Sequence, residues 1–166
     1  MPTPTYTALA NITLGSSAST ITFSSIPATF RDLVLVVAAA STGSGTNAAI
    51  RFNSDSGSNY TRVFMGVNGV GTFSSGTSTQ TGFQFDNFGF VTTTLGATNH
   101  LLSINDYSAT DKHKTILARA NRAGDTLDAL AGRWANTAAI TSVQVVSFSG
   151  ESYIAGSTFA LYGIAS

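Results

Sequence analysis

The stretch Thr115-Ile116-Leu117-Ala118-Arg119-Ala120-Asn121 indicates most clearly how this chain folds. Its even-numbered positions are all apolar, and its odd-numbered positions carry longer or more polar side chains. Successive side chains of a β-strand point to opposite faces, whereas a helix gathers residues three and four apart. The stretch therefore predicts a strand with one face turned toward a core.

The same period of two recurs elsewhere along the chain. Ala18–Phe23 and Thr141–Ser147 alternate in this way, and Leu33–Val37 is apolar throughout, as in a strand covered on both faces. No sustained helical stripe is present, and only Ala38–Ala40 and Ala135–Ala139 are candidates for a short helical turn. These patterns favour an all-β fold.

Gly, Asn, Asp and Ser clusters separate the expected strands, as residues that favour turns should. Strands are expected near residues 5–9, 18–24, 31–40, 48–53, 60–66, 82–90, 99–107, 113–121, 126–136, 140–149 and 157–164. Many short strands with regular turns predict an antiparallel β-sandwich or a barrel in a single domain. We expect this domain at residues 8–166, after an extended N-terminal arm at residues 1–7 that contains two prolines.

The composition excludes several classes of function. Charged residues make up 10% of the 166 residues, against about 25% in an average domain. The formal net charge is zero, so no basic stripe is available for nucleic acid, and little self-repulsion opposes association. The chain has no cysteine for disulfides or thiolate metal sites, and no apolar run long enough to span a membrane.

Nothing in the sequence marks an active site, and we expect neither an enzyme nor a cofactor. The two histidines are His100 and His113, and residue counts alone leave a Ser-His-Asp triad open. However, no Gly-x-Ser-x-Gly turn is present, and the eight acidic residues lie mostly at expected turns. Asn53–Asn59 spaces oxygen ligands as calcium loops do, but its single carboxylate favours a plain turn over a metal site.

The span from Val63 to Asn105 has two interpretations. It contains one charged residue, Asp86, and it is rich in Gly, Ser, Thr and Phe. It is either a glycine-rich loop followed by a core strand or a subunit interface with exposed apolar side chains. The interface interpretation, with the N-terminal arm as a second contact, gives the partner-binding candidates Pro2, Thr3, Pro4, Thr5, Phe73, Phe83, Phe85 and Phe88.

Trp134 is the only tryptophan, and it also has two interpretations. With Asn136 it could form a glycan-binding platform, since sugar sites pair an aromatic ring with polar side chains. The spacing of Leu130, Gly132 and Trp134 on one strand face instead favours a place in the core.

Four stretches carry a resemblance to a known family. They are Ile21–Leu35, Arg51–Tyr60, Asp106–Lys114 and Phe159–Ala165. In this order and spacing they resemble small tailed-phage virion proteins that build a jelly-roll β-sandwich. The resemblance covers most of the chain, and it implies a jelly-roll-like sandwich of about eight to ten strands.

The resemblance also implies a function. It suggests a capsid decoration (cement) protein that binds the major capsid protein as a homotrimer, is made in the host cytoplasm and lies on the capsid surface of the virion. The alternative within the same family is a receptor-binding or head or tail fibre module that contacts host-surface glycans. The length of the chain favours decoration, since a fibre shaft would need more residues. An enzyme that acts on polysaccharide is a weaker third interpretation.

Overall fold

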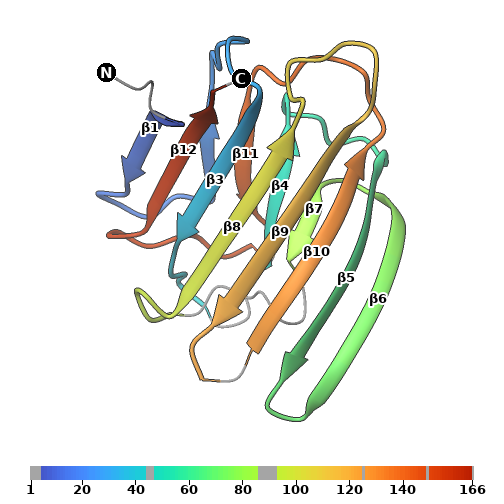
Figure 1. Ribbon diagram of the computed structural model, residues 1–166. Coiled ribbons are helices and arrows are strands. Elements are labelled where there is room, and N and C mark those ends of the chain that lie inside the picture. The colour runs from blue at the N-terminus through green and yellow to red at the C-terminus, as the bar shows by residue number, and fades with distance from the viewer. Residues whose placement is uncertain (1–4, 44–46, 86–92, 125, 149, 166) are drawn as a thin grey trace.

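The computed structural model describes residues 5–43, 47–85, 93–124, 126–148 and 150–165. Within these ranges the chain forms strands and no helix (Figure 1). The strands are β1 (Tyr6–Thr13), β2 (Thr20–Phe23), β3 (Asp32–Ala38), β4 (Ala48–Phe52), β5 (Tyr60–Asn68), β6 (Gly71–Gln80), β7 (Phe83–Phe85), β8 (Thr98–Asn105), β9 (Lys114–Arg122), β10 (Thr126–Trp134), β11 (Val143–Ser147) and β12 (Thr158–Ile164).

The strands form two antiparallel sheets that pack as a sandwich (Figure 1). The large sheet has the order β1-β12-β3-β8-β9-β10-β5-β6, and the small sheet has the order β2-β11-β4-β7. β1 pairs with β12, β2 with β11, β3 with β8, and β4 with β7, so the first half of the chain runs back along the second half. This winding is that of a jelly roll. The predicted all-β, jelly-roll-like sandwich is therefore confirmed.

Two hairpins enlarge one sheet of the jelly roll. β5–β6 and β9–β10 both add to the large sheet beyond β8, and β5 pairs with β10. The small sheet has four strands and the large sheet eight, so β5 and β6 reach past the layer behind them (Figure 1). The enlarged sheet presents one broad outer face to its surroundings.

The core lies between the inner faces of the two sheets. The large sheet contributes Leu35, Ile116 and Phe159, and the small sheet contributes Ile50 and Val145, all of them buried. In β9 the even-numbered side chains from Lys114 to Ala120 are buried and the odd-numbered ones are exposed, which confirms the alternation in the sequence. Period-two patterning thus places each strand in its layer.

A cluster of aromatic rings fills one part of the core. Trp134 is 0% exposed and lies 5.6 Å from Phe52 and 6.3 Å from Tyr60, measured between ring centroids. Phe83 from the small sheet reaches the large sheet over Gly132, where an added Cβ would lie 2.4 Å from the phenyl ring. The placement of Trp134 in the core is confirmed.

Some local predictions are wrong. Residues 71–80 were open to interpretation as a glycine-rich loop, and they form β6. The short helical turns at 38–40 and 135–139 are not formed. Tyr6 and Thr7 pair with β12 opposite Ile164 and Gly163, so they belong to the sandwich and not to the arm. Pro2, Thr3 and Pro4 lie outside the described residues.

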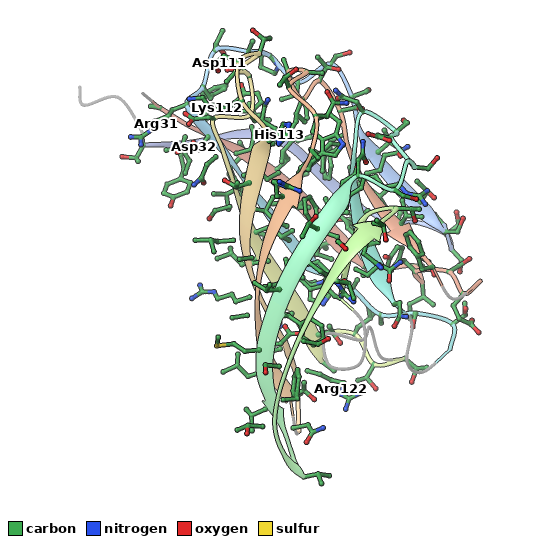
Figure 2. All side chains as sticks on the ribbon, turned by 90° about the vertical axis from the view of Figure 1, so that its right-hand side faces the viewer. Arg31, Asp32, Asp111, Lys112, His113 and Arg122 are labelled. Carbon is green, nitrogen blue, oxygen red and sulfur yellow. The ribbon has the colours of Figure 1, made fainter. Side chains whose placement is uncertain are left out.

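Several charged side chains gather at one end of the sandwich. Figure 2 shows Arg31, Asp32, Asp111, Lys112 and His113 near this end, and Arg122 near the opposite one. Arg31 Nε lies 3.6 Å from Asp32 Oδ2, and the backbone N–H of Asp106 donates to Asp32 Oδ1 at 2.8 Å. Away from this end, Arg119 and Arg133 are the charged side chains that face outward from β9 and β10.

Candidate functional site

An apolar patch covers the outer face of the large sheet across β5, β10 and β9. We call it the apolar face and define it by Val63, Met65, Val67, Leu117, Leu127, Ala129 and Ala131. Strand register brings these residues together, because Ala131 lies directly between Val63 and Leu117. Ala129 pairs with Met65, and Leu127 pairs with Val67.

The apolar face is well exposed. Met65 is 66% exposed, Leu117 62% and Val63 58%. Ala129 and Ala131 are short side chains between longer ones, so the surface sinks along β10 into a depression of about 560 Å³. Single exposed apolar residues are common, but a contiguous group of this kind usually marks an interaction site.

The border of the apolar face is polar and basic. Arg119 and Arg133 occupy outward positions on β9 and β10, and Thr61 accepts a long hydrogen bond of 3.4 Å from Arg133. The acidic residue of β10, Asp128, points inward and is buried. An apolar centre with a polar rim and arginine side chains is the usual anatomy of a protein–protein interface.

The loop between β4 and β5 was a second candidate site, and its geometry is that of a structural turn. Asp55 Oδ1 accepts from the Gly57 N–H at 2.8 Å. Asp55 Oδ2 accepts from Asn59 Nδ2 at 2.8 Å and from Trp134 Nε1 at 2.7 Å. Both carboxylate oxygens are therefore engaged by donors of the protein itself, which favours the turn over a metal site.

The same loop is anchored on its other side by Asn53. Its backbone φ is +52°, a left-handed conformation that asparagine tolerates better than most residues. Its side-chain amide donates to the Ala139 carbonyl at 2.8 Å and accepts from the Thr141 N–H at 2.8 Å. Across the described ranges of the chain, no three His, Asp or Glu side chains gather closely enough to hold a metal ion.

The hydrogen bonds to Asp55 affect its ionisation. Partial burial raises the pKa of the Asp55 carboxyl, but the donors around it outweigh burial and hold that pKa below its ordinary value. These donors are Asn59, Gly57, Trp134 and Asn136. The ionised carboxylate is thus the form that the folded state prefers.

Asp55→Asn should destabilise the protein by about 1.5–3 kcal/mol at pH 7, because it removes a charged acceptor of several hydrogen bonds. The pKa of Asp55 is lower in the folded state than in the unfolded chain, where it is near 3.8. The ionised carboxylate therefore contributes its full stabilisation above this value, and the stabilisation is lost as pH falls through the lower pKa of the folded state.

The free energy of unfolding is measured with urea at pH 7 and at pH 2.5. The difference in this free energy between wild type and Asp55→Asn should be smaller at pH 2.5. Asp111→Asn, at an exposed loop position, is the control, and an equal difference for Asp55→Asn at both pH values would contradict this prediction.

Two of the phenylalanines predicted to bind a partner are in the core. Phe83 is 0% exposed and Phe85 is 1% exposed, because the short alternating strand β7 turns both rings inward. Phe73 is half-buried and packs on Phe64 at 5.8 Å between ring centroids. Of the other candidates, Thr5 is exposed, and Phe88 lies outside the described residues.

The predicted glycan platform is wrong for Trp134, which is buried and donates to Asp55. Asn136 is half-buried, and its side-chain oxygen accepts from the Ala138 N–H at 2.9 Å. His100 is buried and stacks on Phe85 at 4.6 Å, while His113 is exposed in a loop. The structure therefore does not bring the two histidines into one site.

The comparisons with known proteins give no assignment. A scan against protein-family models finds no match to this chain, and a search of curated proteins finds none either. In the described part of the chain, no helix has the length and apolar character needed to cross a membrane. The apolar face is thus the feature of the fold that points most directly to a function.

Proposed function

We propose that this protein is a non-enzymatic structural protein of a tailed-phage virion that decorates the outer capsid lattice and stabilises the shell. It acts as a homotrimer bound to the major capsid protein at the capsid surface, after synthesis in the host cytoplasm. The observation that carries the proposal is the apolar face, where Met65, Leu117 and Val63 are more than half exposed. The resemblance in sequence to jelly-roll virion proteins supports the phage assignment.

The mechanism is mechanical. Burial of apolar area contributes about 25 cal/mol per Å², so the apolar face can supply several kcal/mol per copy when a neighbouring subunit covers it. Ordering and rigid-body entropy oppose this gain, and the net contribution of each copy is smaller. Repetition over a closed lattice turns a modest contribution per copy into substantial resistance to internal pressure.

The decoration role is favoured over the glycan-binding role by the environment of Trp134. Recognition of a sugar ring by stacking requires an exposed aromatic face, and Trp134 is fully buried. Among the described residues, Tyr6 is the aromatic side chain with large exposure, at 58%, and it lies on β1, five strands away from Trp134 on β10. No second candidate function is therefore proposed.

Self-association through the apolar face is tested by charge substitution. Wild-type protein at low micromolar concentration should sediment at about three times the chain mass of 17.1 kDa, as a closed symmetric oligomer. Met65→Lys and Leu117→Lys should both sediment as monomers, because each buries an unpaired ammonium in the contact.

Val70→Lys is the matched control, since Val70 is 97% exposed at the tip of the β5–β6 hairpin, outside the apolar face. It should keep the wild-type mass. A wild-type protein that is strictly monomeric, or a Met65→Lys protein with the wild-type mass, would remove the apolar face as the site of self-association.

A further inference from the structure

Strand β6 forms a free edge of the large sheet. It pairs with β5 on one side, and its other side has no partner strand in the part of the chain that the structure describes. Its pairing with β5 is regular from Gly71 opposite Asn68 to Thr77 opposite Arg62. The irregularity of this hairpin lies beyond that run, where Thr79 has a φ of +65°.

The other three sheet edges are protected and β6 is not. The small sheet ends in β2, with 4 residues, and β7, with 3 residues, and short edges offer few groups for pairing. The opposite edge of the large sheet, β1, is interrupted by a bulge between Ala8 and Ala10. β6 has 10 residues and contains no charged residue and no proline, which are the usual devices that block edge pairing.

The side chains of β6 contribute little to the core. Most of its residues are exposed, on both faces of the strand, and Phe73 is its half-buried apolar contact with Phe64. Ser, Thr and Gly account for nearly all other positions. Packing against the core of the monomer therefore does not explain why β6 is long and regular. Length and regularity are the properties that a strand needs in order to pair with a strand of another chain.

We propose that β6 pairs edge to edge with β6 of a second copy, antiparallel about a twofold axis. The register that uses the whole regular run places Ser74 opposite Ser74 and Gly71 opposite Thr77 of the other copy. Such a contact is isologous, and an uncharged strand meets its own sequence without like-charge repulsion. Small side chains leave room for the two sheets to join.

The joined sheet extends the surface that the proposed function uses. Ser74 pairs with Met65 and Thr72 with Val67, so the small polar side chains of β6 lie on the same side of the sheet as the apolar face, between it and the twofold axis. A single strand pair buries less area than a stable interface needs, so the contact is weak in dilute solution and forms where copies are concentrated. The β6–β6 contact would link neighbouring oligomers on a lattice. The proposal of this contact depends on the free edge of the sheet and does not depend on the phage assignment.

Disulfide trapping tests this contact, because the chain has no cysteine and each introduced thiol is unique. Ser74→Cys should form a disulfide-linked dimer at least ten times faster than Val70→Cys under the same mild oxidation. Val70 lies in the same hairpin and is more exposed, so it controls for random collision. Equal rates for the two variants would overturn the proposal.

The register and the independence of the contact are tested in the same way. A mixture of Thr72→Cys and Gly76→Cys chains should cross-link to the mixed dimer in preference to either homodimer. The Ser74→Cys cross-link should persist with Leu117→Lys in the same chain, since Leu117 lies on β9, three strands away from β6, and the edge contact does not use the apolar face. Loss of the cross-link in that background would assign it to the apolar-face oligomer and refute edge pairing, while leaving the proposed function in place.

Discussion

Deletion of residues 158–166 is expected to abolish soluble folding. These residues include β12, which lies between β1 and β3 in the large sheet. The deletion removes the buried side chains of Phe159 and Leu161, each of which contributes about 1.5–3 kcal/mol by burial. It also leaves β1 without its partner strand and exposes the edge of β3.

The measurement is the soluble yield of the truncated chain and its thermal transition by circular dichroism. Deletion of residues 165–166 alone is the control, because it leaves the pairing of β12 intact and should give a cooperative β-type transition. A chain without residues 158–166 that stayed folded and monomeric would show that β12 is peripheral to the sandwich.

Trp134→Ala is expected to have the largest effect of any single substitution considered, about 3–5 kcal/mol lost from the free energy of unfolding. The indole is fully buried between Phe52 and Tyr60, and its Nε1–H is bonded to Asp55. Removal therefore leaves a cavity and takes one donor from a carboxylate. Trp134→Phe should cost less, since it restores part of the ring volume but not the hydrogen bond.

Urea unfolding followed by circular dichroism measures these differences. Val70→Ala is the control, because Val70 is 97% exposed outside the apolar face and its truncation should cost less than about 1 kcal/mol. If Trp134→Ala were no more destabilising than Val70→Ala, the aromatic cluster would not be an important part of the core.

The sequence predicts those strands whose two faces differ in polarity. β9 shows this well, since its buried Ile116 and Ala118 alternate with exposed Leu117 and Arg119. β6 could not be predicted in this way. Both of its faces are exposed, so Ser, Thr and Gly occupy inward and outward positions alike and leave no period to detect. Pairing with β5, a tertiary feature, makes it a strand.

The apolar face was predicted only in part. Val63, Met65 and Val67 lie in the span from Val63 to Asn105, whereas its residues on β9 and β10 lie outside that span. The low charge between Val63 and Asn105 led to the prediction of a subunit interface there, but Phe83 and Phe85 within this span are core residues. Their exposure depends on which sheet β7 joins, and the sequence does not specify this. The apolar run Val63-Phe64-Met65 does indicate an apolar outer surface, because consecutive apolar residues on a strand place apolar side chains on both of its faces.

The apolar face also depends on a contact that sequence spacing could not supply. Leu117 and Val63 come from strands far apart in the chain, and they approach each other because β10 pairs with both β9 and β5. Ala129 and Ala131 then form the floor of the depression between them. The hairpin insertions that enlarge the jelly roll therefore also create the proposed binding surface.

The most direct test of the decoration role is the binding of purified protein to phage capsids that lack it, measured by co-sedimentation. Wild-type protein should bind to saturation in a fixed ratio to the major capsid protein, and Val70→Lys should bind equally well. Met65→Lys and Leu117→Lys should bind weakly or not at all, because the monomers that they form lack the multivalent attachment of the trimer. Absence of saturable binding by the wild-type protein, or undiminished binding by both apolar-face variants, would contradict the account.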